Sequence, residues 1–469
     1  MDGGSTGSRL HIFEFVLSNA TTGQTNCVRR GSARSYKPLS SFARKEGLQN
    51  EPLNSTAIAG HLIHLFAYAA EVIPPEYHAG TVVTYQATAG MRLLTKDEQD
   101  AIYDSLHQGL MDSERFVFRR MKRSDLGTLE GDMEGFYGAV AANYLTGVVD
   151  SKLRTQDTGA NTKKGPLGAM DMGGSSTQIV YVPGAEPTSS NDDDGEGSSE
   201  DDDDDMPSRL DEDSFFSVSH LAYGVDTMRR RFWDTLIQDR ENQCLETEEC
   251  KSKPIPNPCS FPGYELERNG YTFVGTGDAE GCVKQVQRLI PHYEVDTDRE
   301  HRRVAGVKHP PLRGKFVAMS LYFFSLDSLR VLSEPSKEAH EALNKAWPNP
   351  SIDELHNALH GLCSRSWHDD LVHIQHNSHT YTRAEVLPHR CFESAYLATL
   401  LRDGYGFAPH SRDITFTFLV DGDEVEWSMG MALTKHAEEY EASVSKRRAA
   451  GSNNNTYEEE CEAHEPLLT

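Results

Sequence analysis

The sequence predicts an α/β protein built from two similar lobes, and a repeated phrase is the main reason. Residues 2–9 read DGGSTGSR, and residues 171–178 read DMGGSSTQ. Each copy runs directly into strand-like residues, 10–15 in one case and 179–182 in the other. Strand-like and helix-like segments alternate between the copies, which is typical of mixed α/β layers. The simplest architecture is two lobes that each contribute one loop.

The segments between the two copies support this assignment in order. Apolar residues at helical spacing predict a helix over about 58–70, and a Pro-Pro break at 74–75 ends it. Residues 81–87 then predict a strand, and a further helix begins near Lys96. A helix-like stretch over 139–145 precedes the second copy, where the pattern starts again.

Composition excludes one class of function and marks two polar segments. The chain of 469 residues has a net charge of -26, so it offers no basic surface to neutralise a nucleic-acid backbone. Residues 186–213 hold a run of aspartates with almost no apolar residues, and such a segment cannot bury enough surface to fold. We predict a disordered acidic insert over 186–213 and a disordered tail over 441–469.

The cysteines and the start of the chain favour a secretory route. None of the eight cysteines forms a CxxC pair, which argues against structural zinc and for disulfides. Three sequons, at Asn19, Asn54 and Asn454, are compatible with a glycoprotein. No stretch reaches the roughly 20 apolar residues of a membrane-spanning helix. Because the first strand opens at Met1, we expect an upstream strand, with any signal or membrane anchor, to be missing.

These features together predict a location. We expect the lumen of the secretory pathway (Golgi or ER) or the cell exterior, with a membrane anchor in the full-length form. The sequence indicates no oligomeric state.

Each Gly-rich loop has the chemistry of a phosphate site. Glycines let the backbone curl tightly enough to aim several N–H groups at one point. The hydroxyls add donors, and the carboxylates of Asp2 and Asp171 can hold a hydrated cation beside the anion. Two such loops facing each other would grip a metal-bound polyphosphate from both sides. One copy alone would be weak evidence, because Gly-Ser clusters are usually turns.

An acidic segment between the loops could supply a general base. Residues 129–138 read LEGDMEGFYG and run into a helix-like stretch. Hydrolysis of a phosphoanhydride needs a carboxylate that orients and deprotonates the attacking water. Spacing alone does not distinguish Glu130, Asp132 and Glu134, and an exposed acidic turn is equally compatible with the pattern.

The second lobe also carries a histidine-rich stretch. His356 and His360 share a helical face, and His373, His376 and His379 follow at a spacing of three. Since no further ligand completes a metal cage, surface histidines are the better interpretation.

These motifs carry a resemblance to a known family. The chain resembles the apyrase family of nucleoside triphosphate diphosphohydrolases, which includes the guanosine diphosphatases of the secretory pathway. Five motifs match the family signatures in order, at residues 2–13, 87–93, 134–147, 171–178 and 427–430. Shorter matches lie at 223–224, 257–259, 275–277 and 391–396. Together they cover about residues 2–435 and leave out the acidic insert and the tail.

The resemblance implies the fold and its division. It implies the two-lobed, actin-like (RNase H-like) fold, with the active site in the cleft between the lobes and the chain returning to the first lobe at its end. The first lobe would comprise 1–130 plus about 415–440, and the second lobe 131–414. Trp427 would then pack back onto the first lobe.

Carried over position by position, the resemblance also assigns roles. It makes Glu134 the base that activates water, and Thr88 and Gln178 help to place that water. Asp2 and Asp171 hold Ca²⁺ or Mg²⁺, largely through water. The residues that would bind phosphate are Gly4, Ser5, Thr6, Gly173, Gly174, Ser175, Ser176 and Thr177. Arg92 would brace the second motif. The implied disulfides are Cys259–Cys282 and Cys363–Cys391, and Cys244–Cys250 is suggested as a third pair.

The implied function is divalent-metal-dependent hydrolysis of the terminal phosphate of nucleoside di- and/or triphosphates. The alternatives are an exopolyphosphatase-type phosphatase, a chaperone or sugar kinase of the same superfold, and an inactive nucleotide-binding remnant. The motif at 87–93, the cysteine pairs and Trp427 favour the apyrase interpretation.

Two departures from the family pattern limit what transfers. Ala139 stands where members often have tryptophan, which affects helix packing more than chemistry. Val225 stands where some cell-surface members carry arginine, so a base preference does not transfer. Tyr396 is a candidate for stacking on the base.

Overall fold

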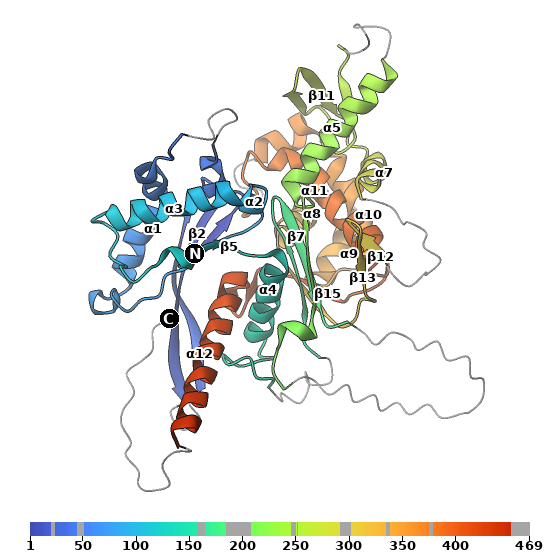
Figure 1. The fold of residues 1–469 in the computed structure, drawn as a ribbon. Helices are drawn as coiled ribbons and strands as arrows, with labels where there is room; N and C mark the ends of the chain where they lie inside the picture. Colours follow the sequence, from blue (N-terminus) through green and yellow to red (C-terminus); the bar gives the residue numbers. More distant parts are fainter. Residues whose placement is uncertain are drawn as a thin grey trace, which may run out of the picture. The chain divides into compact units, whose positions relative to one another are not determined.

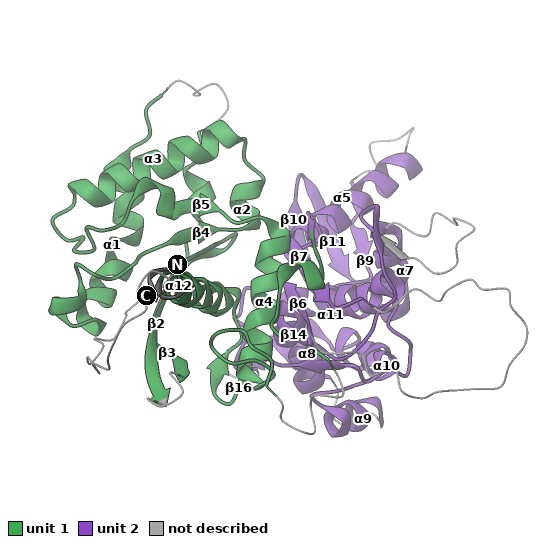
Figure 2. Ribbon diagram, turned by 60° about the horizontal axis from the view of Figure 1, so that its bottom comes forward, with its two compact units in different colours: residues 1–166, 203–219, 419–469 green, residues 167–202, 220–418 purple. Residues whose placement is uncertain are grey.

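The computed structural model groups the chain into two compact units (Figure 2). It describes residues 1–19, 24–44, 51–156, 165–183, 208–244, 250, 252–290, 302–333, 338–374 and 379–451. Unit 1 comprises the described residues of 1–166, 203–219 and 419–469. Unit 2 comprises those of 167–202 and 220–418.

Unit 1 is built on a five-stranded sheet with the order β3-β2-β1-β4-β5 (Figure 1). The strands are β1 Asp2–Gly4, β2 Gly7–Asn19, β3 Gln24–Ser35, β4 Tyr85–Ala87 and β5 Leu126–Thr128. Strand β1 runs antiparallel to β2 and parallel to β4, so Asp2 lies opposite Arg9 on one side and Gln86 on the other. The short central strand therefore delivers the first Gly-rich loop at its carboxyl end.

The helices of unit 1 pack on this sheet or on one another. They are α1 Ser55–Val72, α2 Ala89–Arg92, α3 Lys96–Asp112, α4 Gly131–Leu145 and α12 Trp427–Gly451. The Asn54 side chain caps α1 by accepting the Ala57 N–H, and Thr95 and Glu98 form a capping box at α3. The apolar stripes of α1 and α3 form the core of the unit against the sheet. Figure 1 shows α12 lying alongside α4.

Shorter elements complete unit 1. They are the 3₁₀ turns Leu39–Phe42, Pro75–Tyr77, Arg123–Asp125 and Glu212–Ser214, and the hairpin of β16 Leu419–Val420 with β17 Asp423–Glu424.

Unit 2 repeats the plan of unit 1. Its main sheet has the order β15-β14-β6-β7-β8, with β6 Gly168–Met172, β7 Ser176–Tyr181, β8 Phe216–Leu221, β14 Phe316–Ser320 and β15 Ile414–Phe416. Strand β6 runs antiparallel to β7 and parallel to β14, so Asp171 lies opposite Gln178 on one side and Met319 on the other. Strands β6, β7 and β14 are thus related as β1, β2 and β4 are. The predicted repeat is present in the topology.

The other elements of unit 2 surround this sheet. The helices are α5 Val225–Gln243, α7 Ala279–Leu289, α8 Leu321–Leu332, α9 Glu338–Ala346, α10 Ile352–Cys363 and α11 Arg390–Thr399. A small sheet has the order β10 (Glu265–Arg268), β11 (Tyr271–Gly275), β9 (Ile255–Asn257), and β12 Arg302–Val304 pairs with β13 Val307–His309. No helix within the described ranges is both long enough and apolar enough to cross a membrane.

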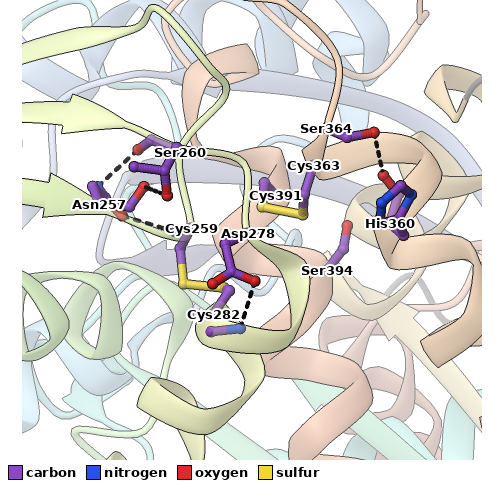
Figure 3. Close-up of a disulfide and its surroundings, with 12 residues drawn as sticks. Asn257, Cys259, Ser260, Asp278, Cys282, His360, Cys363, Ser364, Cys391 and Ser394 are labelled. Atoms are coloured by element: carbon purple, nitrogen blue, oxygen red, sulfur yellow. Dashed lines mark hydrogen bonds between the residues drawn. A yellow bond between two sulfur atoms is a disulfide. The ribbon is translucent and has the colours of Figure 1, made fainter.

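Disulfides fix the helices of unit 2. The described residues contain Cys244–Cys250, Cys259–Cys282 and Cys363–Cys391, which match the implied pairs and the suggested third pair. Figure 3 shows the last two in one region. The backbones are close-packed near Cys363, because a Cβ added at Gly277 would lie 2.6 Å from the Cys363 carbonyl oxygen. Cys363–Cys391 joins the end of α10 to the start of α11. Cys27 is buried without a disulfide, and Cys461 lies outside the described residues.

Parts of the segments predicted to be disordered are folded. Residues 184–207 lie outside the described part, but 208–213 belong to unit 1, where Leu210 is buried and its N–H donates to the Leu153 carbonyl at 2.9 Å. Helix α12 continues to Gly451, so the start of the predicted tail is helical. Its residues 441–451 are rich in Glu, Ala, Lys and Arg, which are polar or small yet strong helix formers.

The contact-based units and the predicted lobes also divide the chain at different points. The prediction assigned residues 131–166 to the second lobe, whereas their contacts group them with unit 1. The reason is α4, which lies at 131–145 and packs along α12.

Candidate active site

The first Gly-rich loop is a tight hairpin in unit 1. Gly4 ends β1, and Ser5 and Thr6 form a two-residue turn before β2. Gly3 cannot carry a side chain, because a Cβ there would lie 2.5 Å from the Tyr85 hydroxyl oxygen. The glycines therefore let the hairpin pack closely against the neighbouring strand. The hydroxyl residues Ser5 and Thr6 lie in the turn, at the carboxyl end of β1.

The Asp2 carboxylate behind this loop is suited to a cation. Its side chain is buried, Oδ2 pairs with Arg9 Nη1 at 2.7 Å, and Oδ1 has no hydrogen-bond partner among the described residues. A buried carboxylate oxygen without a partner is costly, and a hydrated divalent ion would satisfy it with the oxygen ligands that such ions prefer. In the described part of the chain no three His, Cys, Asp or Glu side chains could hold a metal together. An ion held by one carboxylate and water needs no such group.

Helix α2 begins against the same hairpin. The Thr88 N–H donates to the Gly3 carbonyl at 3.0 Å, and the Thr88 side chain is buried. A Cβ added at Gly90 would lie 3.1 Å from the Ser5 Cα. The structure thus brings the second motif to the first loop within one unit.

Burial separates the three candidate bases. Glu130 and Asp132 are exposed, whereas Glu134 in the first turn of α4 is 8% exposed. Arg92 Nη2 donates to Glu134 Oε2 at 2.6 Å. This ion pair offsets the lost hydration of the carboxylate. Gly131 leaves room for it, since a Cβ there would lie 2.5 Å from Arg92 Nη1.

The second loop joins β6 to β7 and is tied to the start of α5. The Gly173 N–H donates to the Ser176 carbonyl at 2.9 Å. The carbonyls of residues 173–175 accept four N–H bonds of 2.8, 2.9, 3.0 and 3.1 Å from residues 222–227. In a planar trans peptide the N–H points opposite to the carbonyl, so the amides of 174–176 face away from α5. Adjacent amides on one side make an anion-binding concavity.

The side chains after this loop have distinct uses. Gln178 Nε2 donates to Ser176 Oγ at 3.0 Å and orients that hydroxyl. Thr177 Oγ1 donates to the Asp171 carbonyl at 2.8 Å and lies 3.1 Å from the Tyr322 hydroxyl. The Thr177 hydroxyl therefore makes hydrogen bonds within unit 2, whereas the resemblance implied that it binds phosphate.

Tyr396 does not have the role suggested for it. Its side chain is fully buried, and its hydroxyl donates to the Tyr223 carbonyl at 2.5 Å. It is therefore inaccessible to a nucleobase, and the stacking interpretation is wrong. Sequence reasoning noted Tyr223 and Gly224 as a match but gave them no role, and the structure places them directly behind the second loop.

Ser320 lies beside the carboxyl end of β6, and sequence analysis did not identify it as a candidate residue. It ends β14 in register with Met172 and begins α8 with φ 54° and ψ -128°. A serine with positive φ is strained, and strain gathers at functional sites. No local motif marks it, because the strain arises from the turn between strand and helix.

The histidine-rich stretch is only partly at the surface. His360 is exposed, but His379 is buried between Asp327 Oδ2 and Thr382 Oγ1 at 2.8 and 2.7 Å. His356 Nε2 donates to the Ala398 carbonyl at 3.1 Å. His376 lies outside the described residues. The buried members serve packing.

Comparison with known proteins decides the family. The profile of the GDA1/CD39 (nucleoside phosphatase) family matches residues 1–447. The chain belongs to this family. The predicted resemblance is thereby confirmed, and membership in the GDA1/CD39 family makes the chain a hydrolase of phosphoanhydride bonds. The exopolyphosphatase alternative is not favoured.

Curated GDA1/CD39 relatives have low sequence identity to the chain but align with most of its length. Golgi apyrase of Saccharomyces cerevisiae is 25% identical over 86% of this chain, and the chain spans 63% of the length of that protein. Ectonucleoside triphosphate diphosphohydrolase 2 of Gallus gallus is 28% identical over 82% of the chain and 74% of its own length. Guanosine-diphosphatase of Schizosaccharomyces pombe is 25% identical over 94% of the chain and 73% of its own length.

A solved structure shows the fold. The nucleoside triphosphate hydrolase structure from Neospora caninum matches 94% of this chain and 92% of its own, with a TM-score of 0.62 and 15% identity. The predicted two-lobed, actin-like α/β fold is therefore confirmed for this GDA1/CD39 member.

Proposed function

We propose that this protein releases the terminal phosphate of nucleoside di- or triphosphates through a water molecule deprotonated by Glu134. One observation carries the assignment: of three neighbouring carboxylates, only Glu134 is buried, and Arg92 holds it at 2.6 Å. A fixed, buried carboxylate is suited to general-base work. Membership in a nucleoside phosphatase family supports the reaction class.

In the proposed reaction, the water oxygen bonds to the terminal phosphorus as the bond to the bridging oxygen breaks. Glu134 takes the water proton, and Thr88 and Gln178 place that water. The amides and hydroxyls of Gly4, Ser5, Thr6 and 173–176 bind the phosphate oxygens, whose negative charge they partly neutralise. Positioning and charge neutralisation supply most of the rate in such transfers.

Asp2 and Asp171 would hold the divalent cation on which this family depends. A bound Ca²⁺ or Mg²⁺ supplies further charge neutralisation and orients the phosphates. The buried Asp2 Oδ1 supports this assignment because it has no hydrogen-bond partner among the described residues.

The relatives and the disulfides also support a location in the secretory pathway or outside the cell. Golgi apyrase and the ectonucleoside enzymes are such relatives by name. Three disulfides in unit 2 fit an oxidising compartment. The finer assignment to the Golgi with a membrane anchor is part of the proposal.

The test is phosphate release from GDP, UDP and ATP with Ca²⁺ or Mg²⁺, with long-chain polyphosphate as a separate arm. We expect Glu134→Gln to lower kcat by about 10²–10⁴-fold, because the amide cannot take the water proton. Glu130→Gln is the matched control: the same change in the same segment, at an exposed side chain that makes no cap hydrogen bond.

Two results would contradict the proposal. If Glu134→Gln turned over at the rate of the Glu130→Gln control, Glu134 would not be the general base. Hydrolysis of polyphosphate without hydrolysis of any nucleotide would restore the exopolyphosphatase alternative.

A further inference from the structure

A strained turn lies behind the second Gly-rich loop. Ala222 has φ +69°, a left-handed conformation that residues other than glycine rarely adopt. Such strain persists only where surrounding contacts over-determine it. On the loop side, the Ala222 N–H donates to the Ser175 carbonyl at 2.8 Å, and the Val225 N–H donates to the Gly173 carbonyl at 3.0 Å.

Gly224 couples the position of this turn to the loop. A Cβ added there would lie 2.3 Å from the Ser175 amide nitrogen and 2.4 Å from the Gly174 carbonyl carbon. The two backbones are therefore in direct contact without spare room. A shift of the turn would move the amides of 174–176, which the proposed function assigns to phosphate.

Tyr396 on α11 holds the turn from the other side. Its buried hydroxyl donates to the Tyr223 carbonyl at 2.5 Å. Helix α11 is a fixed reference, because Cys391 is bonded to Cys363 of α10 and the buried Glu393 accepts a hydrogen bond from Ser325 Oγ of α8 at 2.9 Å.

We propose that Tyr396 is a positioning residue for the phosphate loop of unit 2. Its hydroxyl fixes the Tyr223 carbonyl, and through Gly224 this sets the direction of the amides of 174–176. The proposal rests on the proposed function of that loop. Without the hydroxyl, the buried carbonyl has lost its donor, and the strained turn at Ala222 can relax away from the loop.

The test compares Tyr396→Phe with Tyr181→Phe. Tyr181 is an equally buried tyrosine of unit 2 whose hydroxyl also donates to a carbonyl, that of Pro310 at 2.6 Å. It ends β7 five residues after Ser176, about 16 Å along the strand. Each variant deletes one tyrosine hydroxyl, but only the Tyr396 hydroxyl bonds to the turn that contacts the loop.

Hydrogen exchange without nucleotide is the first measurement. We expect Tyr396→Phe to accelerate exchange of the amides of Ala222 and 225–227, which donate to the loop carbonyls, about tenfold, and Tyr181→Phe to leave it unchanged. In turnover assays, KM for a nucleoside diphosphate should rise about tenfold in Tyr396→Phe with kcat nearly unchanged, because the loop binds phosphate in substrate and transition state alike. Adding Ala222→Gly to Tyr396→Phe should restore slow exchange, since glycine adopts this φ without strain.

The outcomes separate the two proposals. Equal exchange of these donor amides in both tyrosine variants, or no recovery with Ala222→Gly, overturns the positioning role. An unchanged KM in Tyr396→Phe, on an enzyme that turns over, also overturns it. If the unaltered protein hydrolyses no nucleotide, the proposed function fails, and the exchange comparison alone decides the positioning role.

Discussion

Arg92 shows how one residue links two motifs of the site. The resemblance assigned it to bracing its own motif, whereas the structure pairs it with Glu134 at 2.6 Å and places it beside Gly131. The planar guanidinium offers a forked set of donors that an ammonium group does not. The exact direction of the Glu134 carboxylate therefore depends on arginine and not only on positive charge.

We expect Arg92→Lys to lower kcat/KM on the order of 10²-fold, because a small displacement of the base costs that much. The charge remains, so the change should be seen in kcat more than in thermal stability. Arg123→Lys is the control, since Arg123 makes partly exposed ion pairs with Asp100 and Asp104 in the same unit. Equal kinetics in the two variants would show that Arg92 does not position Glu134.

At this scale the sequence predicted which residue types form the site but not their burial. Both Gly-rich loops were evident because the phrase occurs twice. Glu130, Asp132 and Glu134 could not be ranked by spacing, since burial depends on how α4 packs. Tyr396 was misassigned for the same reason: an aromatic side chain in a helix looks the same in the sequence whether it faces a ligand or the core.

At the scale of elements, the position of α4 depends on its contact with α12. A Cβ added at Gly430 in α12 would lie 1.8 Å from the Tyr137 carbonyl oxygen in α4. The two helices therefore meet backbone to backbone, one turn after Glu134. The buried Ala139 belongs to the same helix, and its small side chain stands where family members often have tryptophan.

Gly430→Ala should therefore destabilise the protein by about 1–3 kcal/mol and lower activity, because α4 must shift to admit the methyl group. Gly60→Ala is the opposite case, since Gly60 lies inside α1 with nothing within 4 Å of the added Cβ. That variant should gain about 0.5–1 kcal/mol. Urea unfolding of both variants measures this difference, and a stabilising Gly430→Ala would contradict the close helix contact.

Long elements were predictable, and short strands were not. The helices near 58–70 and from Lys96 were found because they extend over several turns, and both begin at side-chain caps. The strand predicted over 81–87 is β4, which covers only Tyr85–Ala87. Its neighbour β1 has three residues, and a strand can be no longer than its hydrogen-bonded partners allow. The residue pattern of one strand does not show how long its partner strands are, so it could not predict that β4 has only three residues.

For the whole molecule, buried histidines set the pH dependence of stability. Burial lowers the pKa of seven histidines, to about 3 for His11, His220 and His389 and to about 4 for His309, His356 and His436, with His61 as the seventh. Between about pH 4 and 6.5 the unfolded chain binds more protons at these sites, so stability rises with pH in that window. Their contribution is complete above pH 6.5 and is lost as pH falls.

Three carboxyl groups oppose this trend. Burial raises the pKa of Glu426 and Glu212, and a hydrogen bond with Glu426 raises the pKa of Glu424. Their contribution is present below the pKa of an unfolded glutamate and is lost as pH rises. Seven histidines outnumber three carboxyls, so we expect the free energy of unfolding to increase from pH 4.5 to 6.5.

One histidine can be isolated on a single helix. His356 of α10 donates to the Ala398 carbonyl, and glutamine can keep a donor there without titrating. His356→Gln should therefore reduce the slope of unfolding free energy against pH by up to one proton, about 1.4 kcal/mol per pH unit. His360→Gln, one turn later on the same helix at an exposed side chain, is the matched control. Urea titrations at pH 4.5, 5.5 and 6.5 measure both slopes, and equal slopes would mean that His356 takes up its proton in the folded protein as readily as in the unfolded chain.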